Sequence, residues 1–354
     1  MVAIAHSFIA ITFSGVDKIW ETPIWSIEPT DAIIAKLILF VANGQAAVSI
    51  FFVLSGIVLG LSLDHDQSGV IRRYLKFLTK RIFRIYPAHI FTLLIICTTI
   101  IAFSAVNPGT FAYSSTWYNW YYRSLPDSTG IIRNLFLIDV FLNPVTWTLK
   151  VEMGVAVIFP VLHFISRTRN NAAIWMHLSI LTVLILLAII YSDGVFIPHV
   201  YKFYLGLLLP LYLPKISHLE HWAFWPASFT LLLLLPQFLS SNDLNGILIT
   251  AGAVVLISLL MKNQNSWLSH NHIIKKLGQY SYSFYLFHFP VLWFTYFLLN
   301  QNQLWTTLIK SNPFAVASMV CLFSILIAYA ISSATYWLIE KRFILIGRRL
   351  AGSL

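Results

Sequence analysis

Charged residues are scarce in this sequence. Asp, Glu, Lys and Arg together make up 10% of the 354 residues, whereas hydrophobic residues make up 58%. A soluble domain typically carries about 25% charged residues, because its surface has to face water. The composition therefore excludes a soluble enzyme of this length. It predicts an all-α fold, a polytopic transmembrane helical bundle.

Cysteine is almost absent as well. Cys97 and Cys321 both lie inside apolar runs, so we expect neither a disulfide framework nor a cysteine-based metal site. His270 and His272 lie in a polar segment, where we predict no metal site. The sequence also lacks a P-loop, a Gly-x-Ser-x-Gly motif and a cysteine nucleophile. No basic segment precedes the apolar start, so no cleavable signal peptide is expected.

Long apolar runs fill most of the chain, and we predict about ten membrane helices in a single domain over residues 1–354. The first is the apolar stretch 1–13, which is too short to span a bilayer alone at about 1.5 Å per residue. Asn43, Gly44 and Gln45 interrupt the next apolar run. The other predicted helices are 46–63, 88–106, 146–166, 172–191, 200–213, 222–239, 245–261, 280–299 and 313–339.

The net charge of +10 does not indicate a nucleic-acid partner, because the basic residues cluster in short segments between apolar runs. Asp64–Pro87 is the most basic of these segments. By the positive-inside rule it faces the cytoplasm, together with the segments at 167–171, 214–221, 262–279 and 340–354. We therefore expect an integral multi-pass protein of a bacterial inner membrane, surrounded by membrane lipids, with both termini in the cytoplasm.

Aromatic residues gather in the outer segment 107–130. This segment holds Trp117, Tyr118, Trp120, Tyr121 and Tyr122. Such a cluster is typical of the aromatic belt at a membrane interface, which is the interpretation we favour. The same side chains would also suit stacking on sugar rings.

Two ionisable residues, Lys150 and Glu152, lie within the apolar stretch 146–166. An ionisable group at membrane depth costs roughly 2.5–3.5 kcal/mol, so it normally faces the bundle interior and marks a site. Residues two apart on a helix point to different faces, so these two cannot neutralise each other. One of them therefore needs a partner elsewhere in the bundle. The alternative is that both side chains reach outward to lipid headgroups, and Lys150 is assigned no role.

Arg81 and Arg84 are three residues apart in the segment KRIFRIYP, so we expect them on one helical face ahead of Pro87. Paired guanidinium groups on the cytoplasmic side would suit the binding of phosphates. On spacing alone, an anchor to lipid headgroups is the interpretation we favour.

Two histidines, His6 and His288, lie in apolar stretches. A neutral imidazole is tolerated there, and because it titrates near neutrality it can act as a general base. A purely structural role in a hydrogen-bonded network is the alternative for both, and for His288 the neighbouring Ser and Tyr hydroxyls favour it.

Five segments together resemble the acyltransferase 3 family of integral membrane O-acyltransferases. They are AIAHSF, SIFFVLSGIVLG, KRIFRIYP, NPVTWTLKVEM and LGQYSYSFYLFHFPVL, in the order and at about the spacing of that family. Each motif alone is weak, but five in register across nearly the whole chain are specific.

The resemblance implies transfer of an acyl group, commonly acetyl, from acyl-CoA to a hydroxyl of a cell-surface or lipid-linked glycan. No bound cofactor is implied, since acyl-CoA is the donor substrate. The family's first-helix histidine corresponds to His6, its basic pair to Arg81 and Arg84, and its W-[ST]-L-x-x-E motif to Trp147 through Glu152. We expect His6 as the catalytic base oriented by Glu152, and Arg81 and Arg84 as the CoA-binding residues. Trp147 and His288 are expected to have substrate-binding or structural roles.

One feature departs from the family. A cation usually lies eleven residues before the first-helix histidine, and that position would fall before Met1. We therefore expect an apparently truncated first helix. Either the start lies upstream, or the gene is truncated, or this member works without that cation.

Two other functions stay open at this point. A transporter or flippase of a lipid-linked glycan would also have about ten spans and a few buried charges. An inactive fragment with a residual binding role would follow from a missing N-terminus.

Overall fold

The computed structural model describes residues 1–354 except 107–108, 110, 169–171, 216–221, 239–241 and 264–270. The described residues are mainly helical and form isolated β-bridges but no β-strand, which confirms the all-α prediction. The helices are α1 (Val2–Ile9), α2 (Thr30–Val41), α3 (Gly44–Asp64), α4 (Val70–Ala102), α5 (Thr116–Asn119), α6 (Ser128–Leu135), α7 (Trp147–Ser166), α8 (Ala173–Ile190), α9 (Val200–Tyr212), α10 (Phe224–Phe229), α11 (Asn242–Lys262), α13 (His272–Asn300), α14 (Gln303–Ser311), α15 (Pro313–Thr335) and α16 (Lys341–Ser353).

Seven stretches of the described residues are long and apolar enough to cross a membrane. They are Thr30–Asp64, Val70–Ala102, Pro144–Ser166, Ala173–Ile190, Asp243–Lys262, His272–Asn300 and Pro313–Ser353. Three further predicted spans are helical but short: α1, α9 and Phe224–Gln237. The 13 residues of α9 rise only about 20 Å, which is less than the hydrocarbon thickness of about 30 Å.

Several segments predicted as loops are helical extensions of the spans. Asp64–Pro87 was expected to be a loop, yet α4 starts at Val70 and runs through Pro87 without a break. Similarly, α13 begins at His272, and α16 follows α15 through a π-helical turn at Tyr336–Glu340. The prediction rested on hydropathy, but Lys and Arg favour helix formation, so a helix already formed by an apolar run continues into them. Of the two loop histidines, His272 starts α13, and His270 lies outside the described residues.

The chain forms two compact units. Unit 1 comprises Met1–Gly44, Arg84–Trp147 and His272–Phe343, and unit 2 comprises Gln45–Phe83, Thr148–Asn271 and Ile344–Leu354. The break predicted at Asn43 to Gln45 is confirmed, since α2 ends at Val41 and α3 begins at Gly44. It coincides with the first boundary between the units.

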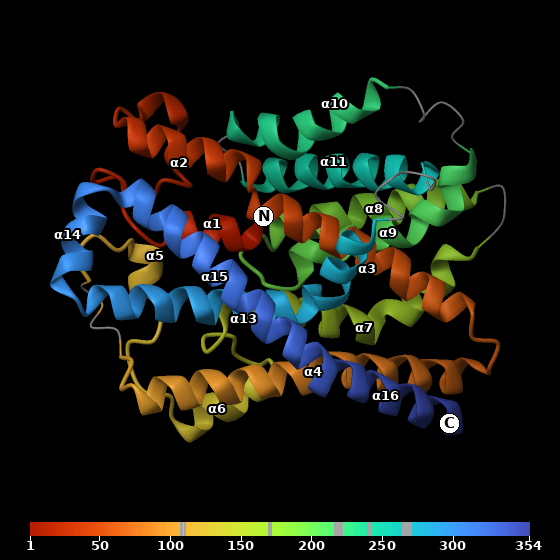
Figure 1. Cartoon of the computed structure of the whole chain (residues 1–354). Helices are drawn as coiled ribbons and strands as arrows, with labels where there is room; N and C mark the ends of the chain where they lie inside the picture. Colours follow the sequence, from red (N-terminus) through yellow and green to blue (C-terminus); the bar gives the residue numbers. More distant parts are fainter. Residues whose placement is uncertain (107–108, 110, 169–171, 216–221, 239–241, 264–270) are drawn as a thin grey trace. The chain divides into compact units, whose positions relative to one another are not determined.

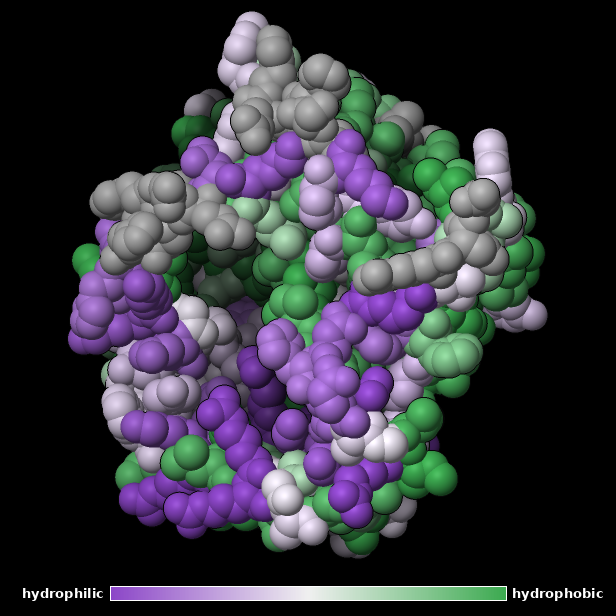
Figure 2. Space-filling view, turned by 90° about the vertical axis from the view of Figure 1, so that its right-hand side faces the viewer, coloured by the Kyte–Doolittle hydropathy of each residue, from purple (hydrophilic) through white to green (hydrophobic). Residues whose placement is uncertain are grey.

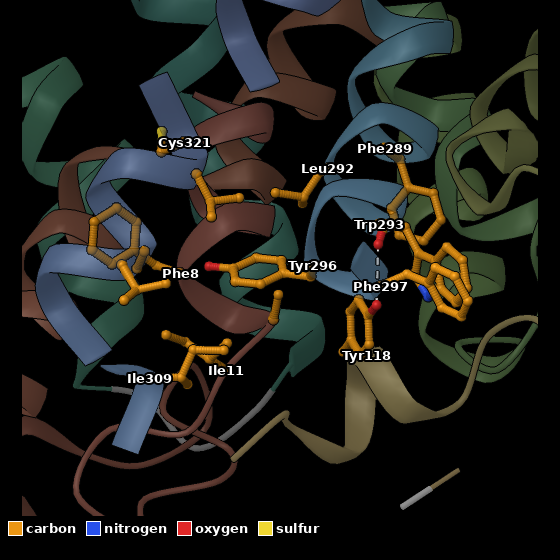
Figure 3. Close-up of a cluster of buried hydrophobic side chains, with 14 of the residues drawn as sticks. Phe8, Ile11, Tyr118, Phe289, Leu292, Trp293, Tyr296, Phe297, Ile309 and Cys321 are labelled. Carbon is orange, nitrogen blue, oxygen red and sulfur yellow. Dashed lines mark hydrogen bonds between the residues drawn. The ribbon is translucent and has the colours of Figure 1, made fainter. Parts of the chain in front are cut away.

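The core of unit 1 is built around α13 and α15, which run side by side (blue in Figure 1). Phe8 and Ile11 pack with Tyr296 of α13, and the Tyr118 hydroxyl donates a 3.0 Å hydrogen bond to the carbonyl of Trp293 (Figure 3). The Tyr122 hydroxyl likewise donates to a backbone carbonyl.

The aromatic-belt prediction is therefore wrong for Tyr118 and Tyr122, which are core residues with exposed fractions of 1% and 8%. Their rings pack against Trp293, and backbone carbonyls accept their hydroxyls, so neither needs an interface. Trp120 is exposed, as a belt residue would be.

In unit 2, α3 and α9 approach each other through a pair of glycines. A Cβ on Gly206 would lie 2.0 Å from the carbonyl oxygen of Val53, and a Cβ on Gly56 would lie 2.1 Å from that of Phe203. Backbones can come this close only where side chains are absent, which is a common device in membrane helix packing. The contact positions the buried face of α3 within unit 2.

Candidate active site

His6 lies on α1 with its ring against His288 of α13. The two histidines are 282 residues apart in the sequence, yet His6 Nδ1 lies 3.1 Å from His288 Nε2. The rings stack with centroids 5.2 Å apart. The structure thus brings together, within unit 1, the two histidines that sequence analysis had named separately.

Aromatic rings surround the His6 imidazole. Trp117 lies with its ring centroid 5.1 Å from that of His6, and Phe289 contacts the imidazole edge-on at 6.0 Å. Tyr121 packs against both Trp117 and Phe289. His6 itself is partly exposed, whereas His288 is only 2% exposed. The pair therefore joins a partly exposed histidine to an enclosed one.

Helix α13 is held at His288 by side chains from the segment before α7. Pro290 has no N–H, so the carbonyl of Leu286, four residues earlier, loses its helical donor. The buried Asn143 amide supplies that donor at 2.9 Å. The Tyr285 hydroxyl donates to the carbonyl of Val145 at 2.9 Å. These bonds place the His288 turn of α13 without using the imidazole.

Glu152, on α7, has its partner in Arg81 of α4. Arg81 donates a 2.7 Å hydrogen bond to the Glu152 carboxylate, and both side chains are buried. This ion pair lies within unit 2 and accounts for a charge at that depth, since a buried charge needs a paired, hydrogen-bonded partner. The predicted partnership of Glu152 with His6 joins residues of the two units and stays a prediction.

Arg81 and Arg84 differ in their surroundings although both lie on α4. Arg81 is buried against Glu152, and Arg84, one turn later, is exposed. Three residues turn a helix by about 300°, so the two side chains point about 60° apart and need not share an environment. A separation of about 60° still leaves both side chains on one face of α4, and their binding of CoA phosphates stays a prediction.

Comparison with known proteins decides the family. The model of the acyltransferase 3 family, described as an acyltransferase domain, matches residues 1–333. The chain belongs to the acyltransferase 3 family. Together with the seven apolar helices, this makes it an integral multi-pass membrane protein.

The acyltransferase 3 chain also resembles acyltransferase MdmB of Streptomyces mycarofaciens. The two are 30% identical over 141 residues, which cover 37% of this chain and 32% of that protein. The match thus spans about a third of the length of the relative. No solved structure matches the chain.

The remaining residues named from the sequence lie around α7 of this acyltransferase-family chain. Trp147 is the first residue of α7 and is half-buried, as is Lys150 one turn later. Among the residues that the structure describes, no three or more His, Cys, Asp or Glu side chains gather in a way that could hold a metal ion.

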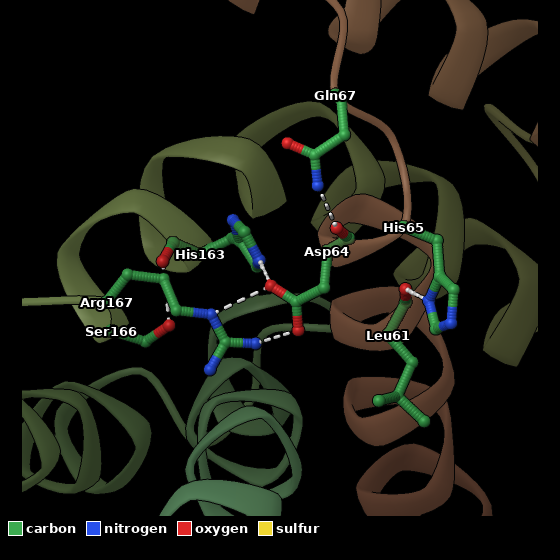
Figure 4. Close-up of polar contacts among 7 residues, drawn as sticks. All are labelled: Leu61, Asp64, His65, Gln67, His163, Ser166 and Arg167. Carbon is green, nitrogen blue, oxygen red and sulfur yellow. Dashed lines mark hydrogen bonds and ion pairs between the residues drawn. The ribbon is translucent and has the colours of Figure 1, made fainter.

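One polar cluster of the acyltransferase 3 chain was missed in the sequence. Asp64, at the end of α3, accepts a 2.9 Å hydrogen bond from His163 Nε2 and binds the Arg167 guanidinium through both carboxylate oxygens (Figure 4). The spacing of His163 and Arg167, four residues apart near the end of α7, was the available signal. Figure 2 shows the side of the molecule that lies at the right in Figure 1, and hydrophilic residues gather over part of it.

Proposed function

We propose that this protein is a membrane O-acyltransferase that moves an acetyl group from acetyl-CoA to a hydroxyl of a cell-surface or lipid-linked glycan. Membership of the acyltransferase 3 family supports acyl transfer. The observation that carries the proposal is His6, a partly exposed residue whose imidazole contacts the enclosed imidazole of His288 and is surrounded by aromatic rings.

His6 would act as general base on the acceptor. A sugar hydroxyl is a poor nucleophile near neutral pH, and a positioned base contributes about 10²–10⁴-fold to the rate. The hydroxyl oxygen bonds to the thioester carbonyl carbon while its proton passes to His6. The carbon–sulfur bond then breaks, and the departing CoA thiolate takes up that proton. Thioester and hydroxyl thus become ester and thiol with no other reactant.

Acetyl-CoA is the proposed donor, and Arg81 and Arg84 are the proposed contacts for its phosphates. Arg84 is exposed and can present its planar guanidinium to a phosphate directly. Arg81 is already bonded to Glu152, so in this proposal Glu152 fixes the Arg81 guanidinium rather than serving the reaction itself.

The acceptor is proposed to stack on the aromatic side chains beside His6. Trp117 and Tyr121 are half-buried, and Trp117 contacts the His6 ring. Aromatic faces suit the apolar faces of sugar rings, and here they would place a hydroxyl beside an imidazole. This revives the sugar-stacking interpretation of segment 107–130 for these two residues.

The assay uses membranes that contain the protein, supplied with acetyl-CoA labelled in the acetyl group. We expect label to enter the glycan fraction and to be released by alkaline hydroxylamine, which cleaves O-esters but not amides. Membranes without the protein are the control. A transporter or an inactive fragment transfers no label, and that result in protein that inserts normally would overturn the proposal.

We also propose an orientation with both termini and the Asp64–Pro87 region in the cytoplasm, because exposed basic residues gather on α4 and α16. They include Arg72, Lys80, Arg348 and Arg349. Reporter fusions at residues 70 and 354 should then report inside, and a fusion at residue 120 should report outside. Reversed signals would overturn this orientation.

A further inference from the structure

The hydrogen bonds of His288 determine which of its nitrogens carries the proton. His288 Nδ1 lies 2.7 Å from the carbonyl oxygen of Tyr285. A carbonyl oxygen can only accept, so Nδ1 must be the donor and carry the hydrogen. In a neutral imidazole the other nitrogen, Nε2, then has no hydrogen and is an acceptor.

The protonation of His288 also determines which ring nitrogen of His6 carries the hydrogen. Its Nδ1 faces His288 Nε2 at 3.1 Å, and two acceptors would repel each other at that distance. His6 Nδ1 must therefore carry the hydrogen and donate it to His288. Neutral His6 is left with an unprotonated Nε2, whose lone pair is directed away from His288.

We propose that His288 is a positioning residue that holds His6 in the Nδ1–H tautomer, so that Nε2 is the atom that takes the proton of the acceptor hydroxyl. This inference rests on the proposed function of His6 as general base. The chain of bonds runs from the carbonyl of Tyr285 through His288 to His6, with each donor and acceptor set by the one before.

His288 also suits the step after proton transfer. When His6 takes the hydroxyl proton on Nε2, both of its nitrogens carry hydrogen, and Nδ1–H still donates to His288 Nε2. The bond therefore persists in both protonation states of His6, and it strengthens when its donor becomes charged. No reorientation of either ring is needed between proton uptake and proton release to the thiolate.

Two substitutions at one position separate tautomer control from simple packing. In His288→Gln the amide oxygen can reach the position of Nε2 and accept from His6. In His288→Asn the shorter amide can reach only the position of Nδ1, so it can bond to the Tyr285 carbonyl but not to His6. We expect His288→Gln to keep kcat within about 10-fold of wild type. We expect His288→Asn to lose about 10²–10⁴-fold in kcat, the range for a lost general base, with little change in KM.

The direct measurement is solid-state NMR of the membrane-embedded protein with ¹⁵N-labelled histidine, with the His6 signals assigned by their loss in His6→Ala. A ring nitrogen that carries hydrogen and one that does not have clearly different shifts. Wild type and His288→Gln should show His6 as the Nδ1–H tautomer, and His288→Asn should show it as the Nε2–H tautomer, whose Nε2 has no lone pair to accept the hydroxyl proton. His272→Ala, which removes an exposed imidazole from the first turn of α13, is the matched control and should change neither readout.

The possible outcomes distinguish failure of the inference about His288 from failure of the proposed acyltransferase function. If His6 in wild type carries its hydrogen on Nε2, or if His288→Asn leaves the tautomer and kcat of wild type, the inference is overturned even in an active acyltransferase. If wild type transfers no acyl group, the proposed function fails, whereas the NMR result still decides whether His288 sets the tautomer.

Discussion

Two histidines of this protein make hydrogen bonds of similar length to very different partners. In unit 1, His6 faces the imidazole of His288 at 3.1 Å. In unit 2, His163 faces the carboxylate of Asp64 at 2.9 Å, and Arg167 binds the same carboxylate. A carboxylate accepts from an imidazole in either charge state of the imidazole. Two imidazoles keep their bond only while they share no more than one extra proton, because two like charges in contact repel.

The difference in partners favours a structural role for the Asp64 cluster and a chemical role for the His6–His288 pair. The Asp64 cluster ties the end of α3 to the end of α7 with a compensated charge, which suits a structural role. The His6–His288 pair joins a partly exposed histidine to an enclosed one, and a shared hydrogen between two ring nitrogens fits the proposed proton transfer. Five predictions test this contrast.

The largest expected effect separates the two histidines. His6→Ala should lower acyl transfer by about 10²–10⁴-fold at unchanged protein level, because a general base is lost. His163→Ala should leave kcat near wild type and lower thermal stability instead, because it removes one bond of a structural cluster. Transfer assays on membranes with matched protein amounts measure both. Wild-type transfer by His6→Ala would refute the contrast, and His288 would then be the candidate base.

The next effect concerns the buried ion pair of unit 2. Glu152→Leu removes the carboxylate bonded to the buried Arg81, and Arg81→Leu removes the guanidinium bonded to the buried Glu152, so each should destabilise the protein by about 3–5 kcal/mol. The double variant Arg81→Leu/Glu152→Leu should be more stable than either single variant. Unfolding in detergent measures this coupling. Additive losses would mean that the two side chains act independently.

Glu152→Gln separates charge from shape at the same position. It keeps the size of the side chain and an acceptor for Arg81 but removes the negative charge. If Glu152 acts only through Arg81, transfer should fall mainly with stability and with the KM for acetyl-CoA. A loss of kcat alone, in stable protein, would favour the predicted partnership with His6.

A smaller effect is expected at Arg84. Because this guanidinium is exposed, Arg84→Ala should spare stability and raise the KM for acetyl-CoA by about 10-fold, as loss of one charged hydrogen bond would. Arg84→Lys should restore only part of the affinity, since an ammonium lacks the planar fork. Initial rates over a range of acetyl-CoA concentrations measure this. Full rescue by Lys, or an unchanged KM, would favour the lipid-headgroup anchor.

The smallest effect is expected at Asp64. Asp64→Asn keeps an acceptor for His163 and Arg167 but removes the charge from a partly exposed cluster, so the loss should be about 1 kcal/mol or less. The midpoint of thermal unfolding, measured at low and high salt, checks this, since salt should shrink the difference. Loss of acyl transfer in stable Asp64→Asn protein would move catalytic importance to unit 2.

Much of the fold followed from the sequence because apolar runs and helix breakers act locally. The all-α class, the long spans and the break before Gly44 were predicted correctly. The errors arose where hydropathy and helix propensity disagree. Asp64–Pro87 is polar enough to be assigned to a loop, yet most of it is helical. Pro87 lies inside α4 and does not end that helix.

The sequence by itself predicted the candidate site residues: a histidine in each of two apolar stretches, an acid at membrane depth and a basic pair. Only the tertiary structure decided how they combine. His6 meets His288 across 282 residues, and Glu152 meets Arg81 across 71. No local pattern encodes such contacts, because they depend on how distant helices pack. Pro290 also leaves the carbonyl of Leu286 without its helical donor. The Asn143 amide can donate to that carbonyl only after the chain has folded, because the two residues are 143 apart in the sequence.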